Sequence, residues 1–342
     1  MTSRMTVAVA LAALLLAACS KSSTSESAAG APASFTVGEL ALFAPLPPLL
    51  GTREQPMAEA RTALGRALFY ETVLSESHDI SCNSCHALER WGVDGRKVSL
   101  GHDGRAGKRN APSVYNAAGQ LAQFWDGRAK DVEAQALGPI LNPIEMGMPD
   151  SAAVLAHLRA SRSYVASFRA AFPGERQPVT MGNLGRAIGA FERRLVTPSR
   201  WDKFLDGDST ALTTEERAGL RTFLDAGCQA CHAGTYLGGD SYMKAGAAKK
   251  WFSQADSGRY QVTHDPKDVL FFKVPALRNI EKTGPYFHDG SVASLEEAVL
   301  LMARHQLGKN LTPSDVQSIV TWLGSLTGEL PLQYIASPQK PI

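Results

Sequence analysis

A pattern of two cysteines and a histidine occurs twice in this chain. The first copy reads Cys82-Asn83-Ser84-Cys85-His86, and the second reads Cys228-Gln229-Ala230-Cys231-His232. Two thiols at this spacing can form thioethers to the two vinyl groups of a haem, and the adjacent histidine can ligate the iron. A single motif of this kind could instead be a redox dithiol or half of a zinc site. Two copies favour haem, so the sequence predicts two covalently bound c-type haems.

The beginning of the chain predicts export. Residues 5–18 are apolar, too few to span a bilayer and typical of a signal peptide. The run ends Leu16-Ala17-Ala18-Cys19, which resembles a bacterial lipobox. We therefore expect residues 1–19 to be a lipoprotein signal peptide, with Cys19 lipidated. Ser20 then favours the outer membrane, facing the periplasm. The alternative is an ordinary secretory signal cleaved near Ala18.

The cysteine count agrees with this assignment. The chain has five cysteines, one for lipid and two pairs for haem, so no pair remains for a structural disulfide. The formal net charge is +2, which gives no argument for nucleic-acid binding.

The remaining chain divides into a tether and two halves. Residues 20–37 include a stretch rich in Ser, Ala, Gly and Thr, which is typical of a flexible tether. Pro198 follows a helical pattern over residues 181–196, and we place the boundary between the halves there, at 38–197 and 198–342. Strand signals are few. The sequence therefore predicts a mainly α fold of two cytochrome c-like haem domains packed against each other.

A faint internal repeat supports the two halves. A helical pattern over residues 56–70 precedes the first haem motif. Its Arg61-x-x-Leu64-x-x-x-Leu68 spacing matches Arg217-x-x-Leu220-x-x-x-Leu224 before the second motif. Amphipathic helices are often alike, so the repeat is weak evidence by itself. Residues 35–50 are apolar and rich in proline, and we expect an extended segment laid over the fold.

A glycine-rich loop follows the first motif. Five glycines lie between Gly92 and Gly107, which excludes a stable helix or central strand there. His102 is the only histidine in this loop. A histidine on a mobile loop beside a haem can be a sixth iron ligand, and the alternative is a solvated loop residue.

Several longer blocks resemble the bacterial dihaem cytochrome c peroxidases. The resemblance covers about residues 40 to 335. The matching blocks are Ser99 to His102, Arg109 to Pro112, Gln123 to Arg128, Phe272 to Asn279 and Pro285 to Ser291.

The resemblance implies a role for each matching residue around the first haem. His86 is similar to the proximal ligand of the low-potential, peroxide-reducing haem, and His102 to its removable distal ligand. Glu145 resembles the acid–base of the distal pocket, with Gln135 beside it. Trp125 resembles the relay between the haems.

The resemblance also implies a calcium site and a ligand for the second haem. One calcium ion is implied between the domains, held by Asn110 and the backbone carbonyls of Thr283 and Pro285. Met302 matches the second axial ligand of the haem at Cys228 and Cys231. A related branch, the MauG-like oxidases, carries tyrosine there, so methionine favours the peroxidase branch.

These residues also have reasons in their own chemistry. Ser294 and Glu297 form a predicted capping box for a helix that places Met302 on its apolar face. A soft thioether favours ferrous iron and raises its potential, whereas a histidine pair at the first haem holds a lower one. Peroxide reduction needs a proton shuttle, which the Glu145 carboxylate can provide. Without the resemblance, Met302 and Trp125 would be read as core residues and Glu145 as an exposed loop carboxylate.

Three functions stay open at this point. The first is a periplasmic peroxidase that reduces hydrogen peroxide with electrons from a small cytochrome c or a cupredoxin. The second is a dihaem electron carrier with both irons permanently six-coordinate, which the glycine-rich loop disfavours. The third is a MauG-like oxidase of a protein or organic substrate, which Met302 disfavours. Members of the family are often homodimers, so the resemblance implies that state too.

Overall fold

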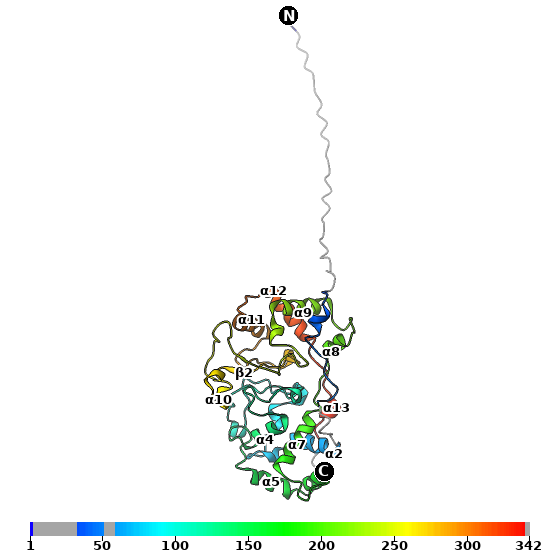
Figure 1. The fold of residues 1–342 in the computed structure, drawn as a ribbon, viewed down its shortest axis with the longest axis vertical. Coiled ribbons are helices and arrows are strands. Elements are labelled where there is room, and N and C mark those ends of the chain that lie inside the picture. The colour runs from blue at the N-terminus through cyan, green and yellow to red at the C-terminus, as the bar shows by residue number, and fades with distance from the viewer. Residues whose placement is uncertain (3–32, 51–58, 339–342) are drawn as a thin grey trace. The chain divides into compact units, whose positions relative to one another are not determined.

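A computed structural model describes residues 1–2, 33–50 and 59–338 of the chain. The chain separates into two units, Met1–Ala31 and Pro32–Ile342. The predicted leader, Cys19 and most of the predicted tether lie outside the described residues. The second unit is mainly helical, as the sequence predicts (Figure 1).

Two short strands pair antiparallel, β1 (Tyr242–Lys244) and β2 (Phe271–Lys273), with Tyr242 opposite Lys273. Short 3₁₀ turns (η) connect many of the elements. The α-helices are α1 (Val37–Leu40), α2 (Glu59–Phe69), α3 (Cys82–Cys85), α4 (Val132–Leu141), α5 (Ser151–Ala160), α6 (Arg162–Ala171), α7 (Met181–Glu192), α8 (Arg200–Leu205), α9 (Thr214–Ala226), α10 (Tyr260–Thr263), α11 (Leu295–Gln306), α12 (Pro313–Gly324) and α13 (Leu332–Ile335).

One hydrophobic core is built from α2 and α4 to α7. Helix α2 buries Leu64 and Leu68, as its predicted apolar face requires, and packs against α7. A Cβ on Gly65 would overlap the Ala187 carbonyl, so glycine allows the two backbones to approach closely. Thr180 caps α7 by accepting a hydrogen bond from the Asn183 backbone N–H at 3.1 Å.

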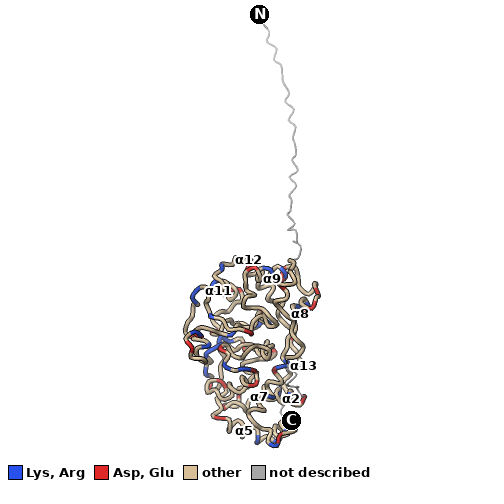
Figure 2. Tube along the Cα trace, viewed as in Figure 1, with Lys and Arg blue, Asp and Glu red and all other residues tan. Residues whose placement is uncertain are grey.

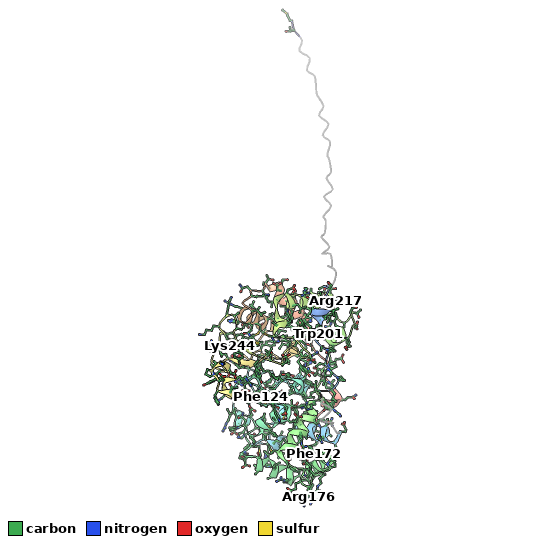
Figure 3. The ribbon with its side chains drawn as sticks, in the orientation of Figure 1. Phe124, Phe172, Arg176, Trp201, Arg217 and Lys244 are labelled. Atoms are coloured by element: carbon green, nitrogen blue, oxygen red, sulfur yellow. The ribbon has the colours of Figure 1, made fainter. Side chains whose placement is uncertain are left out.

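A second core is built from α8, α9, α11 and α12. Helix α9 buries Leu220 and Leu224, the positions that repeat those of α2, and packs against α12. Gly219 meets the Ser318 carbonyl in the same close approach. Figure 3 shows Trp201 of the second core and Phe172 of the first at opposite ends of this unit.

Each end of the folded unit packs in the hydrophobic core of the opposite half of the chain. Phe43 packs in the second core, although it precedes the first haem motif, and Ile335 near the C-terminus packs in the first. The apolar segment at 35–50 contains the short helix α1, and its later part runs without a helix to the buried Leu50. The domain limits at residues 38, 197 and 198 stay a prediction.

Buried polar groups join the two halves. The Thr197 hydroxyl accepts hydrogen bonds from the side-chain amides of Asn116, at 2.8 Å, and Asn279, at 2.9 Å. Both asparagines adopt positive φ and precede a 3₁₀ turn, η4 (Ala117–Gly119) and η7 (Ile280–Lys282). They therefore mark a second internal repeat. Arg109 adds a forked ion pair to Asp256 across the halves, at 2.6 and 2.8 Å.

Charged residues are interspersed over this unit, as Figure 2 shows, in keeping with the small net charge. Within the described ranges, we find no helix with the length and apolar character that crossing a bilayer requires.

Candidate functional site

The first cysteine motif begins a short helix and ends in a turn. Cys82 and Cys85 are the first and last residues of α3, and both are half-buried. The Nδ1 atom of His86 lies 3.3 Å from the Gly92 carbonyl, so an Nδ1–H donates there and leaves Nε2 free. Burial lowers the pKa of His86, which favours the neutral imidazole that ligates a metal.

The second motif repeats this geometry. Cys228 begins the 3₁₀ turn η5 (Cys228–Ala230), and Cys231 follows it. The Nδ1 atom of His232 lies 3.0 Å from the Leu237 carbonyl, which again leaves Nε2 free. Burial lowers the pKa of His232 as well. An imidazole oriented by a backbone carbonyl is the arrangement that metal-ligating histidines use, so both motifs fit a haem.

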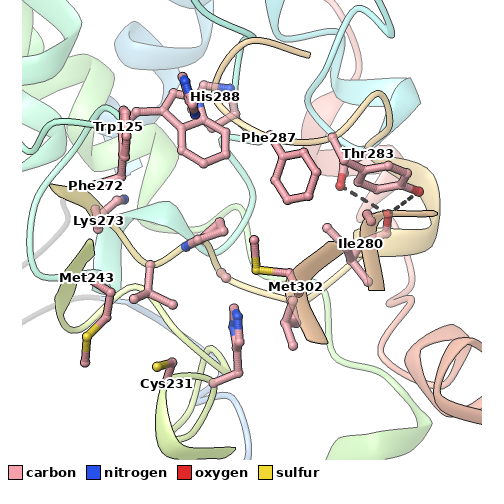
Figure 4. Close-up of a pocket in the computed structure, with 18 of the residues that line it drawn as sticks. Trp125, Cys231, Met243, Phe272, Lys273, Ile280, Thr283, Phe287, His288 and Met302 are labelled. Atoms are coloured by element: carbon pink, nitrogen blue, oxygen red, sulfur yellow. Dashed lines mark hydrogen bonds between the residues drawn. The ribbon is translucent and has the colours of Figure 1, made fainter. Parts of the chain in front are cut away.

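A largely apolar cavity of about 270 Å³ lies at the second motif. Cys228, Cys231 and His232 line it, and so does Met302 from α11. Figure 4 shows Met302 and Cys231 among the side chains around this cavity. The structure therefore brings Met302 to the site that the sequence assigns to the second haem. Ser294 caps α11 through the Glu297 N–H at 3.1 Å, but the reciprocal bond of the predicted capping box does not form.

The glycine-rich loop carries His102 to the segment of Glu145. The His102 backbone N–H donates to the Glu145 carbonyl at 2.6 Å, and a Cβ on Gly101 would overlap that segment. On the His102 ring, Nε2 lies 3.1 Å from Asp103, and Nδ1 is buried with no hydrogen-bond partner among the described residues.

The same segments reach the first cysteine motif. Burial raises the pKa of Cys85, the Ser99 hydroxyl beside it lowers this pKa, and the nearby charge of Glu145 raises it. Cys85, Ser99, His102 and Glu145 are thus close together, although they span 61 positions of sequence from 85 to 145. The structure therefore brings His102 and Glu145 near the first motif, and their roles stay predictions.

Glu145 lies in a half-buried position. Burial raises the pKa of its carboxyl group, while Arg128 and a hydrogen bond from Asn142 at 2.9 Å oppose this increase. Arg128 is itself held over the Phe124 ring, 3.4 Å from the ring centroid. A carboxyl group with a raised pKa holds its proton more readily than a solvated one, as a group that both accepts and returns a proton requires.

The other two predicted catalytic residues lie in different surroundings. Gln135 is half-buried in α4, and its side chain makes no hydrogen bond to the described residues. Trp125 lies where the halves meet: its Nε1–H donates to the Asn110 carbonyl at 2.9 Å, and its carbonyl accepts from the Lys273 N–H at 2.8 Å. Its ring lies edge-on to His288, with centroids 6.3 Å apart.

The predicted calcium ligands line the same cavity. Asn110, Thr283 and Pro285 all belong to its wall. The carbonyl oxygens of Thr283 and Pro285 accept no hydrogen bond from the described residues, which leaves them free for a hard cation. Elsewhere in the described ranges, no group of three or more His, Cys, Asp and Glu side chains is placed to hold a metal ion. The predicted calcium ligands are the Asn110 amide and two backbone carbonyls, so a search for His, Cys, Asp and Glu side chains does not test them.

Sequence reasoning missed three residues at these sites. Arg128 lies near Glu145, His288 packs on Trp125, and Lys273 is buried in the cavity wall. The repeated turn Phe-Trp-Asp-Gly and Phe-His-Asp-Gly was a usable signal for His288, because it places Trp125 and His288 at equivalent positions of two similar turns. Lys273 lies in the matching block Phe272 to Asn279, but no sequence pattern predicted a role for it.

Comparison with known proteins gives consistent results. The family model described as di-haem cytochrome c peroxidase matches residues 59–210. The chain is 44% identical over 297 residues to cytochrome c551 peroxidase of Pseudomonas aeruginosa, covering 85% of this chain and 86% of that protein. It is 43% identical to cytochrome c551 peroxidase of Nitrosomonas europaea, covering 86% and 88%.

A solved structure gives the same fold. It is a MauG-like protein associated with microbial copper homeostasis, with a TM-score of 0.73 and 32% identity, covering 86% of this chain and 95% of that one. The fold, the two repeated motifs and the identity over most of the sequence agree, and the chain belongs to the di-haem cytochrome c peroxidase family.

Proposed function

We propose that this protein is a periplasmic dihaem c-type cytochrome c peroxidase. It reduces hydrogen peroxide to water, and it takes the electrons from a small cytochrome c or a cupredoxin. The identity of 44% to a protein named as a cytochrome c peroxidase supports this, against 32% for the MauG-like structure. One haem is attached at Cys82 and Cys85, and the other at Cys228 and Cys231.

The observation that carries the proposal is the convergence of His102 and Glu145 on the first motif. An electron carrier needs two ligands at each iron, but it has no use for a half-buried carboxyl group with a raised pKa beside one of them. A peroxidase needs that group, because two electrons and two protons are required for each peroxide converted to two waters.

The haem, when bound, supplies the electrons and an iron that can accept a peroxide oxygen. The chain itself manages the proton. Glu145 is placed to take the proton from one peroxide oxygen and to give it to the leaving oxygen, with Asn142 fixing its orientation at 2.9 Å. Gln135 is proposed to lie beside the substrate, although no described contact supports it.

His102 is proposed to gate the first haem. With haem bound, His102 would serve as its removable second ligand and would be released on reduction of the second haem. Its ring has a buried nitrogen, Nδ1, that makes no hydrogen bond to the described residues, which is compatible with a displaceable ligand. Trp125 carries the coupling between the halves, because it is bonded to Asn110 on one side and to Lys273 on the other.

The remaining proposals concern calcium, location and assembly. Asn110 with the Thr283 and Pro285 carbonyls would hold one calcium ion, which metal analysis of the dialysed protein tests. Lipidated Cys19 would anchor the protein to the outer membrane. The homodimer is tested by light scattering of the detergent-solubilised protein.

Steady-state peroxide consumption separates the three functions. The haem-loaded protein is mixed with hydrogen peroxide and a reduced small cytochrome c or cupredoxin, and oxidation of the donor is followed optically. A peroxidase oxidises two donors per peroxide. A carrier exchanges electrons without consuming peroxide. A MauG-like oxidase consumes peroxide only with a protein or organic substrate, and either of these results would overturn the proposal.

A further inference from the structure

The wall of the cavity at the second motif has an unbalanced charge. Among the described residues that line it there is no aspartate or glutamate, but there are two basic side chains, Lys273 and Arg278. Arg278 is neutralised by a forked ion pair with Asp202, at 2.8 and 2.9 Å. Lys273 is 8% exposed and has no carboxylate within ion-pair distance among the described residues.

The only side-chain partner of the Lys273 ammonium in the described ranges is a neutral amide. Its Nζ atom donates to the Gln120 side-chain oxygen. The backbone leaves the lysine little freedom to turn away, because Lys273 pairs with Tyr242 in the sheet and donates to the Trp125 carbonyl. Figure 4 shows Lys273 beside Phe272 in the wall.

Burying an ammonium group beside a neutral amide is unfavourable. Burial lowers the pKa of Lys273 to about 8, which expresses that cost. Buried charges in proteins are normally paired with an opposite charge. A haem carries two propionate groups, and it would bring two carboxylates into a cavity whose wall provides none.

The geometry points to Lys273 as the counter-charge of a propionate of the haem attached at Cys228 and Cys231. This inference rests on the proposed haem attachment. An ammonium bonded to a propionate offsets negative charge near the iron, and this favours the ferrous state. Lys273 is therefore a positioning and potential-setting residue of the electron-storing haem, not a catalytic residue.

Three variants test this assignment by the reduction potential of that haem in a spectroelectrochemical titration. Lys273→Met removes the charge and should lower the reduction equilibrium constant about tenfold, which is about 59 mV for one electron. Lys273→Arg keeps the charge and should stay within about twofold, or about 18 mV. Gln120→Leu removes the neutral partner but keeps the ammonium, and it should also stay within about twofold.

Two results would overturn the assignment. One is a potential within about twofold of the wild type in Lys273→Met with both haems present. The other is an equal drop in Gln120→Leu, which would show that the bond between the halves matters and the charge does not. If Lys273→Met does not fold, resonance Raman spectra of the wild type and Lys273→Arg test the contact between the lysine and the propionate instead. The propionate bending band should differ between the wild type and Lys273→Arg, and an identical band contradicts the assignment.

The same samples separate this inference from the proposed function. Covalent haem is counted on the wild type from its pyridine haemochrome spectrum. A wild type without haem at Cys228 and Cys231 contradicts the proposed attachment. If both haems are attached and the reduction potential is the same in Lys273→Met as in the wild type, only the role of Lys273 is contradicted.

Discussion

The Glu145 carboxyl group has the surroundings of an acid–base residue. It is half-buried, it accepts one hydrogen bond from Asn142, and its backbone carbonyl binds the His102 N–H. Desolvation raises its pKa, while the guanidinium of Arg128 opposes this from a distance. These contacts fix the carboxyl group next to the loop that carries the proposed gate.

Glu145→Gln keeps the shape of this side chain and removes the titratable group. Turnover of hydrogen peroxide should fall by about 10² to 10⁴, because general acid–base catalysis contributes an effect of this size. Haem content and both reduction potentials should stay near those of the wild type. Glu89→Gln, at an exposed position near the same motif, is the matched control. Activity of Glu145→Gln within a few-fold of the wild type would show that another carboxylate acts.

His102→Gly removes the proposed gate and leaves the loop in place. The fully oxidised variant should react with peroxide at once and show no lag before turnover, since nothing then occupies the sixth position. The wild type should need one-electron reduction first. Stopped-flow mixing of oxidised protein with peroxide measures both, and His78→Gly, at an exposed histidine outside the loop, is the control. An oxidised wild type that already reacts with peroxide would contradict the gate.

At the scale of single residues, the sequence predicted the residues that belong to motifs. It missed the residues whose role depends only on how the chain packs. The two histidines next to the cysteines, His102, Glu145 and Met302 all follow from spacing or resemblance. The structure places Met302 in the cavity of the second motif and His102 beside the Glu145 segment, and their roles stay predictions. Lys273 could not be found in this way. Its importance depends on the absence of carboxylates around a cavity whose wall comes from distant parts of the chain.

Helix α7 carries a buried acid that no function uses. Glu192 is 4% exposed, and burial, together with the nearby charge of Glu133, raises its pKa to about 8. The cation beside it is already engaged, because Arg193 forms a forked ion pair with Glu133 at 2.9 Å for both bonds. The folded protein therefore keeps Glu192 protonated at pH values where the unfolded chain has released the proton.

Glu192→Gln should change how stability depends on pH. Because the pKa is higher in the folded protein, the wild type loses stability as the pH rises from the unfolded pKa, about 4.3, through 8. At pH 7 this loss is on the order of 3 kcal/mol. The variant should be more stable than the wild type at pH 8, with the difference reduced to about 1 kcal/mol at pH 5. Denaturant unfolding of the haem-loaded protein measures it.

The exposed Glu296→Gln is the control for this comparison and should leave the profile unchanged. Equal stabilities of wild type and Glu192→Gln at pH 8 would show that the carboxylate is solvated after all.

The presence of the helices was predicted well, but the residues at which they end were predicted less well. The apolar spacing of Leu64 with Leu68, and of Leu220 with Leu224, gives α2 and α9 correctly, because burial on one face determines both pattern and packing. The pattern over 181–196 predicts α7, but the helix ends at Glu192. Phe43 was not expected in the second core. When a chain end packs in the core of the other half, no pattern in the nearby sequence indicates it.

At the scale of the whole molecule, the predicted lipid anchor decides where the protein works. Cys19→Ser should release the protein from the membrane fraction or block its maturation, because the serine cannot accept the lipid. Fractionation of cells that express wild type and variant measures this. Unchanged membrane partitioning of the variant would remove the lipoprotein assignment, and Cys228→Ser, which leaves the leader intact, should partition as the wild type does.

The most direct test of the whole account is the number of covalent haems and their positions. Mass spectrometry of the denatured wild type should show two haems per chain, and peptide mapping should find one on Cys82 and Cys85 and one on Cys228 and Cys231. Replacing either cysteine pair with serine should leave one haem. A wild-type chain with a single haem, or with haem that acid–acetone extracts, would contradict the account.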